Sequence, residues 1–250
     1  MKKNILLFLI TSIFGLTAHA DLSANKFNLS ENDVQQQFEE FRKLFLPSLQ
    51  NVGIHDLKTQ LDQESPEYAG GVQVENNVAE ISFGRDYVLN SEQVSSDILS
   101  FTLCHELGHL LGETPKNLLP SWGVPSEEAE SDYFAAAICL KKWFKTIAPH
   151  LSEKEMQQRT IRAGFDLFKM MRINLLKEGV ITHETAFYAE PNPNKKDTGF
   201  YEKYPSFQCR FETVVAGASC QTDYLNYSGE NNNQWSCRSG DGKRPSCWYK

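Results

Sequence analysis

The stretch Cys104-His105-Glu106-Leu107-Gly108-His109-Leu110-Leu111-Gly112 is an apolar segment that contains the motif His-Glu-x-x-His. In a helix, residues four apart lie on one face, one turn from each other. His105 and His109 could therefore bind one zinc ion, at the usual Zn–N distance of about 2.0–2.1 Å. Glu106 would then lie where it can take a proton from a zinc-bound water. The pattern predicts a helix with two metal ligands and a general base.

The residues around the motif favour a buried helix. Asn90 or Ser91 can cap its start, and Gly112 can end it. Ile98 and Phe101 continue the stripe of the two histidines, so we expect the imidazoles to emerge from a buried face. The alternative is that the histidines are ordinary core or surface residues of an amphipathic helix.

A catalytic zinc site needs three protein ligands and one open position. Segment 125–135 begins with Pro and Ser and is rich in acids, which is typical of a helix start. Of its three glutamates, only Glu128 has an aspartate four residues later, Asp132, which could accept the free ring N–H of a liganding histidine. We therefore predict Glu128 as the third ligand, and Glu127 and Glu130 as solvated charges.

These motifs resemble those of a known group of enzymes. His-Glu-x-x-His followed by Glu-x-x-x-Asp is the gluzincin pattern of zinc peptidases, and Glu128-Ala-Glu-Ser-Asp-Tyr-Phe-Ala looks like the CAAX prenyl protease and HtpX family. The segment Tyr204-Pro-Ser-Phe-Gln-Cys-Arg210 resembles that family's His-Pro segment followed by an arginine, with Tyr204 where a histidine is usual. The resemblance covers roughly residues 70–215. The family members named are membrane proteins, and we expect this chain to be a soluble relative.

The resemblance implies a zincin-like metalloendopeptidase with one Zn²⁺ per chain and a peptide or protein substrate. Glu106 would be the general base. Tyr204 is the first candidate to donate a hydrogen bond to the negative charge that develops on the carbonyl oxygen, and His183 is the second. Arg210 would organise the site by pairing with a carboxylate.

Two other functions remain open at this point. A non-catalytic, zinc-stabilised or metal-free module could bind or chaperone partners through the cysteine-rich tail. The presence of Glu106 argues against it, because a binding protein needs no general base. A zinc amidase acting on cell-wall peptides would keep the site and change only the substrate.

The first twenty residues have the pattern of a secretory signal peptide: Lys2 and Lys3, an apolar run, then Ala18-His19-Ala20. The run is short for a membrane span. We expect cleavage before Asp21, export to the periplasm or secretion, and no stable membrane insertion, with a retained N-terminal anchor as the alternative. The net charge of −7 argues against nucleic acid or anionic membrane as a partner.

Cysteine usage agrees with export. Four cysteines fall in the last part of the chain: Cys209, Cys220, Cys237 and Cys247. We expect two disulfides there, in any of three pairings, with a second zinc site as the alternative. Cys104 and Cys139 lie on the two predicted zinc helices, and we expect buried free thiols, with a disulfide between the helices as the alternative.

The rest of the pattern predicts an α+β fold that is mostly helical. Helices are expected from Ser30 to Phe45, ending before Pro47, from segment 125–135 to about Phe144, and from Ser152 to Gly179. Strands at 54–63, 72–74 and 78–83 predict a small antiparallel sheet. By resemblance, strand 78–83 could be an edge that pairs with an extended peptide, but interior pairing is an equal alternative. We divide the mature chain into a metallopeptidase domain, 21–205, and a disulfide-rich extension packed on it, 206–250.

Overall fold

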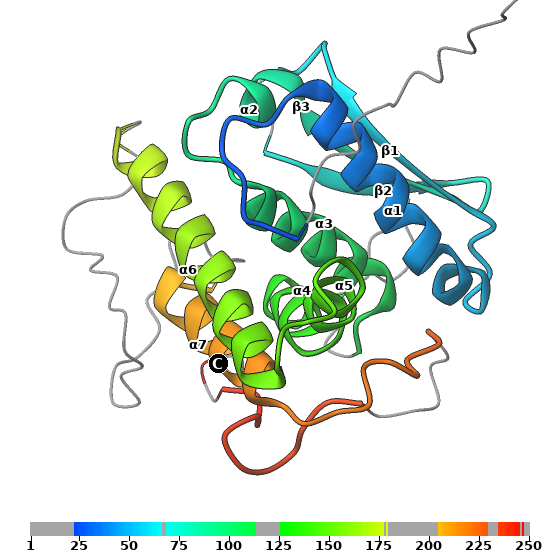
Figure 1. Ribbon diagram of the computed structural model, residues 1–250, viewed down its shortest axis with the longest axis vertical. Coiled ribbons are helices and arrows are strands. Elements are labelled where there is room, and N and C mark those ends of the chain that lie inside the picture. Colours follow the sequence, from blue (N-terminus) through cyan, green and yellow to red (C-terminus); the bar gives the residue numbers. More distant parts are fainter. Residues whose placement is uncertain are drawn as a thin grey trace, which may run out of the picture.

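A computed structural model describes residues 23–66, 69–113, 126–177, 179, 205–229, 235–245 and 247. The predicted signal peptide lies outside the described residues, as do Tyr204 and His183. The described chain is α+β: a three-stranded sheet covered by a long helix, joined to a group of helices that surround one central helix (Figure 1). None of the helices in these ranges is long and apolar enough to cross a membrane.

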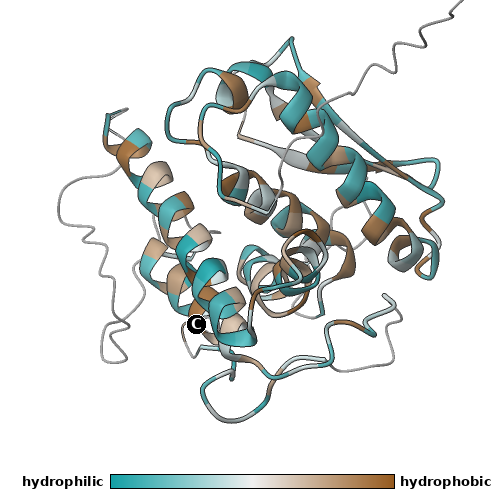
Figure 2. Cartoon of the chain, viewed as in Figure 1, coloured by the Kyte–Doolittle hydropathy of each residue, from teal (hydrophilic) through white to brown (hydrophobic). Residues whose placement is uncertain are grey.

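Helix α1 (Glu31–Gln50) packs against the sheet. Ser30 caps it as predicted, because its side chain accepts a hydrogen bond from the Asp33 amide while the Asp33 carboxylate accepts one from the Ser30 amide. The predicted end was wrong, since the helix continues through Pro47, which lies inside it. The continuation buries Leu49 in the core, which offsets the hydrogen bond that proline cannot make. Figure 2 shows mainly hydrophilic residues on the side of α1 that faces the viewer.

The sheet contains β1 (Asp56–Asp62), β2 (Gly71–Glu75) and β3 (Val78–Gly84) in the order β1-β3-β2. The prediction of an antiparallel sheet was wrong: β2 is antiparallel to β3, but β1 is parallel to it. Asn76 and Asn77 form the tight turn of the β2–β3 hairpin, both with positive φ. Strand β3 lies between the other two, so the interior alternative holds for it and an edge role does not.

The short helix α2 (Arg85–Leu89) precedes α3 (Ser96–Leu111), the central helix. The predicted N-terminal caps of α3, Asn90 or Ser91, were wrong: Asn90 ends α2, and Ser95 caps α3 by accepting a hydrogen bond from the Ile98 amide. A β-bridge between Ser95 and Phe27 holds the capping residue in extended conformation. Gly112 follows the last residue of α3, as predicted. Nearly every side chain of α3 is buried, which is typical of a helix surrounded by other elements.

The second predicted zinc helix consists of three continuous parts, α4 (Glu128–Phe134), the π-helical turn η1 (Ala135–Cys139) and α5 (Leu140–Ile147). Two glycines allow it to lie close to its neighbours. A Cβ on Gly108 of α3 would lie 2.8 Å from the Cα of Ser131, and one on Gly217 would lie 2.9 Å from the Cβ of Ala136.

Helix α6 (Glu153–Lys177) begins after Ser152, as predicted, and packs beside α7 (Phe207–Ser219) (Figure 1). Helix α7 was not predicted. It also packs against α4 and η1, so the predicted boundary between residues 205 and 206 separates α7 from helices with which it shares a core. The described residues from 220 onwards, which we call the C-terminal arm, are largely irregular.

Three disulfides include all six cysteines: Cys104–Cys139, Cys209–Cys247 and Cys220–Cys237. The last two confirm the prediction of two bridges in the C-terminal portion and establish their pairing. The expectation of free thiols at Cys104 and Cys139 was wrong. These residues face each other where α3 crosses η1, and the bridge joins the two helices that carry the predicted metal ligands. Three disulfides are compatible with an exported protein in an oxidising compartment.

Candidate metal centre

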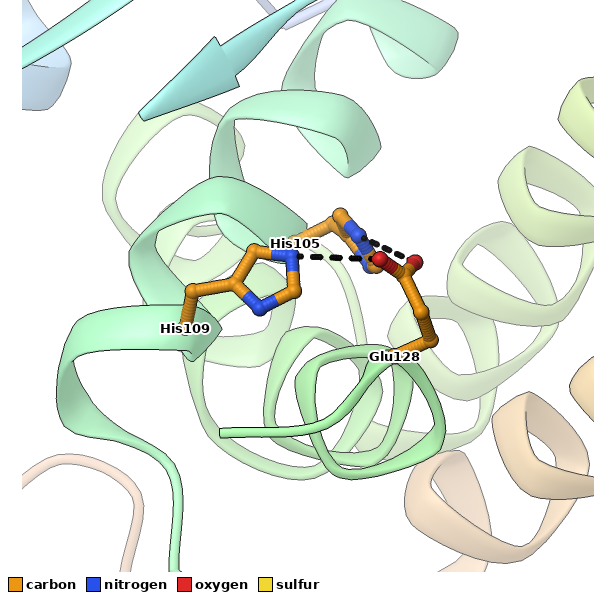
Figure 3. A group of neighbouring side chains, drawn as sticks. All are labelled: His105, His109 and Glu128. Carbon is orange, nitrogen blue, oxygen red and sulfur yellow. Dashed lines mark ion pairs between the residues drawn. The ribbon is translucent and has the colours of Figure 1, made fainter. Parts of the chain in front are cut away.

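His105, His109 and Glu128 meet at one point between α3 and α4. One ligand atom of each residue lies within 4.8 Å of those of the other two. The Glu128 carboxylate is 3.2 Å from Nε2 of His105 and 3.7 Å from Nε2 of His109. Figure 3 shows this carboxylate facing both rings. The two imidazoles come from successive turns of α3, and Glu128 is the first residue of α4. The group could hold a metal ion.

Asp132 lies behind His105. It is one turn after Glu128 on α4, and its side chain is fully buried. Its Oδ1 is 2.8 Å from Nδ1 of His105, so Nδ1–H donates to the carboxylate. With Nδ1 bound to Asp132, Nε2 is the ring nitrogen that faces Glu128 and that a metal ion would bind in place of a proton.

His109 is held by neutral groups. Its Nδ1 is 2.7 Å from the main-chain oxygen of Ser126 and 2.9 Å from the hydroxyl of Ser131. The carbonyl accepts from Nδ1–H, which again leaves Nε2 free to act as a ligand. Sequence reasoning missed both serines. A main-chain carbonyl has no side-chain signature, and for Ser131 the only available signal was its position beside Asp132.

Arg210 reaches the site from α7. Its Nε donates to Oδ2 of Asp132 at 2.6 Å and its Nη2 to Oδ1 at 2.8 Å, while Nη2 also lies 3.5 Å from Oε2 of Glu128. The guanidinium lies over the ring of Phe168, 4.8 Å from its centre. Arg210 thus pairs with the buried carboxylate that orients His105.

The carboxylates favour positive charge at the centre of the site. Burial acts to lower the pKa of His105, but the charge of Asp132 and its hydrogen bond outweigh burial and raise the pKa to about 10. Burial likewise acts to raise the pKa of Glu128, but His105 and Arg210 hold it well below its usual range. A divalent cation coordinated by these residues would meet the same favourable field.

Glu106 follows His105 on α3 and is 7% exposed. Burial raises the pKa of its carboxyl above the ordinary value, although the nearby His105 and His109 act in the opposite direction. A carboxyl with a raised pKa beside a metal site suits proton transfer near neutral pH.

One acid was predicted incorrectly. Glu130 was expected to be solvated, but it is fully buried and pairs with Arg244 at 2.7 Å. An arginine from the C-terminal arm lies too far along the sequence for local spacing to indicate the pair.

No family model, curated protein or solved structure matched this chain. The resemblance therefore rests on the motif residues.

Proposed function

We propose that this chain is an exported, zinc-dependent metallopeptidase that hydrolyses peptide bonds. The observation that carries the proposal is the convergence of His105, His109 and Glu128, with Glu106 buried on the same helix. Two imidazoles and one carboxylate are a usual ligand set for catalytic zinc, which keeps a further position for water or substrate.

The orientation of the ligands supports a fit to zinc. Both imidazoles direct Nε2 toward the same carboxylate, and both have Nδ1 occupied by an acceptor. When bound, the ion would lower the pKa of a coordinated water and polarise the scissile carbonyl.

The chain's own residues would then have distinct roles. Glu106 accepts the proton of the attacking water and later passes it to the leaving amine. Asp132 keeps His105 in the required tautomer, and Arg210 neutralises and orients Asp132. Tyr204 stays a prediction as the donor to the carbonyl oxygen.

An extended substrate would pair with β2 in this proposal. Within the described ranges β2 pairs with β3 alone, and it packs near α3. Its outer edge offers main-chain donors and acceptors for strand addition. Strand β2 takes the place of β3 as the proposed peptide-pairing edge, because β3 lies between the other two strands. Export is supported by the signal-like N-terminal sequence and the three disulfides.

The test is cleavage of casein and of a fluorescent peptide library by the purified, oxidised protein. We expect chelator-sensitive activity that Zn²⁺ restores. Glu106→Gln should lower kcat about 10²–10⁴-fold while metal content stays near one per chain. The matched control is Glu127→Gln, which changes the residue next to Glu128 and should leave activity intact.

Two outcomes would redirect the proposal. Equal inactivity of the wild type and Glu106→Gln over a broad peptide panel would favour the binding module. Cleavage confined to cell-wall peptides would favour the amidase.

A further inference from the structure

We infer that Arg244 is a positioning residue of the metal centre, which aligns the helix that carries the imidazoles with the helix that carries Glu128. The inference rests on the proposed metal site. Arg244 lies in the C-terminal arm, 114 residues beyond its partner Glu130 in the numbering of the chain. Its ion-pair partners Glu113 and Glu130 are not among the three ligands.

Arg244 pairs with two carboxylates, one just after α3 and one in α4, the two helices that carry the candidate metal ligands. Its Nη2 lies 2.7 Å from Oε2 of Glu130 and 3.1 Å from Oε2 of Glu113. Glu113 comes directly after Gly112, which ends α3, and Glu130 lies in the first turn of α4. The two glutamates also touch directly, because the Glu113 amide donates to Oε1 of Glu130 at 2.7 Å.

These contacts lie close to the ligands along each helix. Glu113 is four residues after His109, and Glu130 is two residues after Glu128. A shift of either glutamate therefore moves the end of a helix that carries a ligand. The ion pair fixes the end of α3 against the start of α4, and so the distance between the imidazole pair and the Glu128 carboxylate.

The arm holds Arg244 in place through further contacts. Oε1 of Glu113 accepts hydrogen bonds from the amides of Trp235, at 2.8 Å, and Ser236, at 3.2 Å. The Tyr133 hydroxyl donates to the carbonyl of Gly242, two residues before Arg244. The Arg244 guanidinium lies 5.6 Å from the centre of the Tyr133 ring. The C-terminal arm thus packs against both the end of α3 and α4.

The test compares Co²⁺ binding by the wild type, Arg244→Met, Arg244→Lys and Arg159→Met. Co²⁺ is the probe because its visible bands depend on coordination geometry. Arg159→Met is the matched control: it removes another partly buried arginine–carboxylate pair from α3, at the Asp97 end. Urea unfolding of each variant gives the loss of stability.

We expect Arg244→Met to weaken Co²⁺ binding about 10–100-fold and to change the visible spectrum. Arg244→Lys keeps the charge and should recover part of the affinity. Arg159→Met should leave affinity and spectrum unchanged. The inference is overturned if Arg244→Met binds Co²⁺ like the wild type, or if Arg159→Met causes the same change, since the role would then be only structural.

Arg244→Met removes the cation that pairs with the fully buried Glu130 and could prevent folding. Glu130→Gln/Arg244→Met removes the buried carboxylate together with its cation and avoids that cost, while Glu113 is partly exposed and keeps its hydrogen bond from Ser236. It should fold and show the same loss of Co²⁺ affinity, and wild-type affinity in this double variant would overturn the inference.

Peptide cleavage is measured separately. If the wild type cleaves nothing while Co²⁺ binding depends on Arg244, the proposed function fails and the inference stands. Absence of Co²⁺ binding by the wild type overturns the inference.

Discussion

The two ends of α3 are both held by arginines from distant parts of the chain, but with different consequences. At the N-terminal end, Arg159 forms two hydrogen bonds with Asp97, at 2.9 and 2.7 Å. At the C-terminal end, the Tyr227 hydroxyl donates to the Leu111 carbonyl at 2.9 Å, and Arg244 reaches Glu113. Only the second end carries imidazoles and meets α4. The same chemistry therefore stabilises the helix at one end and aligns a site at the other.

The largest difference should appear between Arg210, which pairs with Asp132 behind the candidate site, and Arg159 at the opposite end of α3, when each is replaced by methionine. Arg210→Met removes the guanidinium that pairs with Asp132, which is fully buried in the middle of α4, and leaves that carboxylate paired with the imidazole of His105. We expect a loss of about 3–5 kcal/mol in the free energy of unfolding. Arg159→Met should cost less, about 1–2 kcal/mol, because Asp97 lies in the first turn of α3, where the helix dipole favours a carboxylate. Urea unfolding of the oxidised proteins measures both.

Equal losses for the two variants would remove the distinction between the two regions. Asp132→Asn in the Arg210→Met background provides a check. It removes the buried charge that Arg210 no longer balances and should recover stability, whereas Co²⁺ affinity should stay low because His105 loses its charged partner.

A smaller effect is expected from moving α4 away from the C-terminal end of α3. In Gly108→Ala, the new Cβ would lie 2.8 Å from the Cα and main-chain oxygen of Ser131, so α4 must shift. We expect a loss of about 1–3 kcal/mol and weaker Co²⁺ binding. The control is Gly164→Ala on α6, where the new Cβ meets the side chains of Val214 and Phe101 instead of backbone. Calorimetry and Co²⁺ titration test the pair of variants. Unchanged Co²⁺ affinity in Gly108→Ala would contradict the inference that the position of α4 against α3 sets the ligand geometry.

The comparison also explains which parts of the site the sequence could predict. His105, His109, Glu128 and Asp132 lie together as predicted, because each pair on one helix is spaced by one helical turn. The role of Glu106, which was inferred from its place next to His105, stays a prediction. Local spacing is set by helix geometry alone, so it is visible without the fold. Arg210 was found only through the resemblance of its segment to a family motif.

The contacts that hold the ligands were mostly missed. Arg244 pairs with glutamates more than a hundred residues earlier, and such pairs leave no periodic trace in a sequence. Ser95 caps α3 because of its bridge to Phe27, which is also a tertiary contact. The parallel pairing of β1 with β3 was missed for a similar reason, since alternation indicates strands but not their direction.

The smallest expected effect concerns the first residue of the arm. The Nζ of Lys141, on α5, donates to the carbonyl of Cys220 at 2.6 Å and is largely buried. Burial lowers the pKa of Lys141 to about 8, against a partly opposing effect of Glu153. The unfolded chain should have the ordinary lysine value, about 10.4. Between these two values the unfolded state binds more protons at this residue, so the contribution of Lys141 to stability should rise with pH.

The rise should be at most about 1.4 kcal/mol per pH unit, and below about pH 8 this residue should contribute no pH dependence. Above about pH 10 buried tyrosines act in the opposite direction, because burial raises the pKa of Tyr133 to about 12. Other groups titrate in the same range: the raised pKa of His105 acts in the opposite direction, and the lowered pKa of Lys142 acts in the same direction as that of Lys141. The difference in slope between the wild type and Lys141→Met, from urea unfolding between about pH 8 and 9.5, therefore isolates the lysine. Lys141→Met should lower the slope, whereas Lys43→Met, at an exposed position of α1, should keep it. An unchanged slope in Lys141→Met would show that the buried lysine does not couple the arm to α5 as the contact with Cys220 implies.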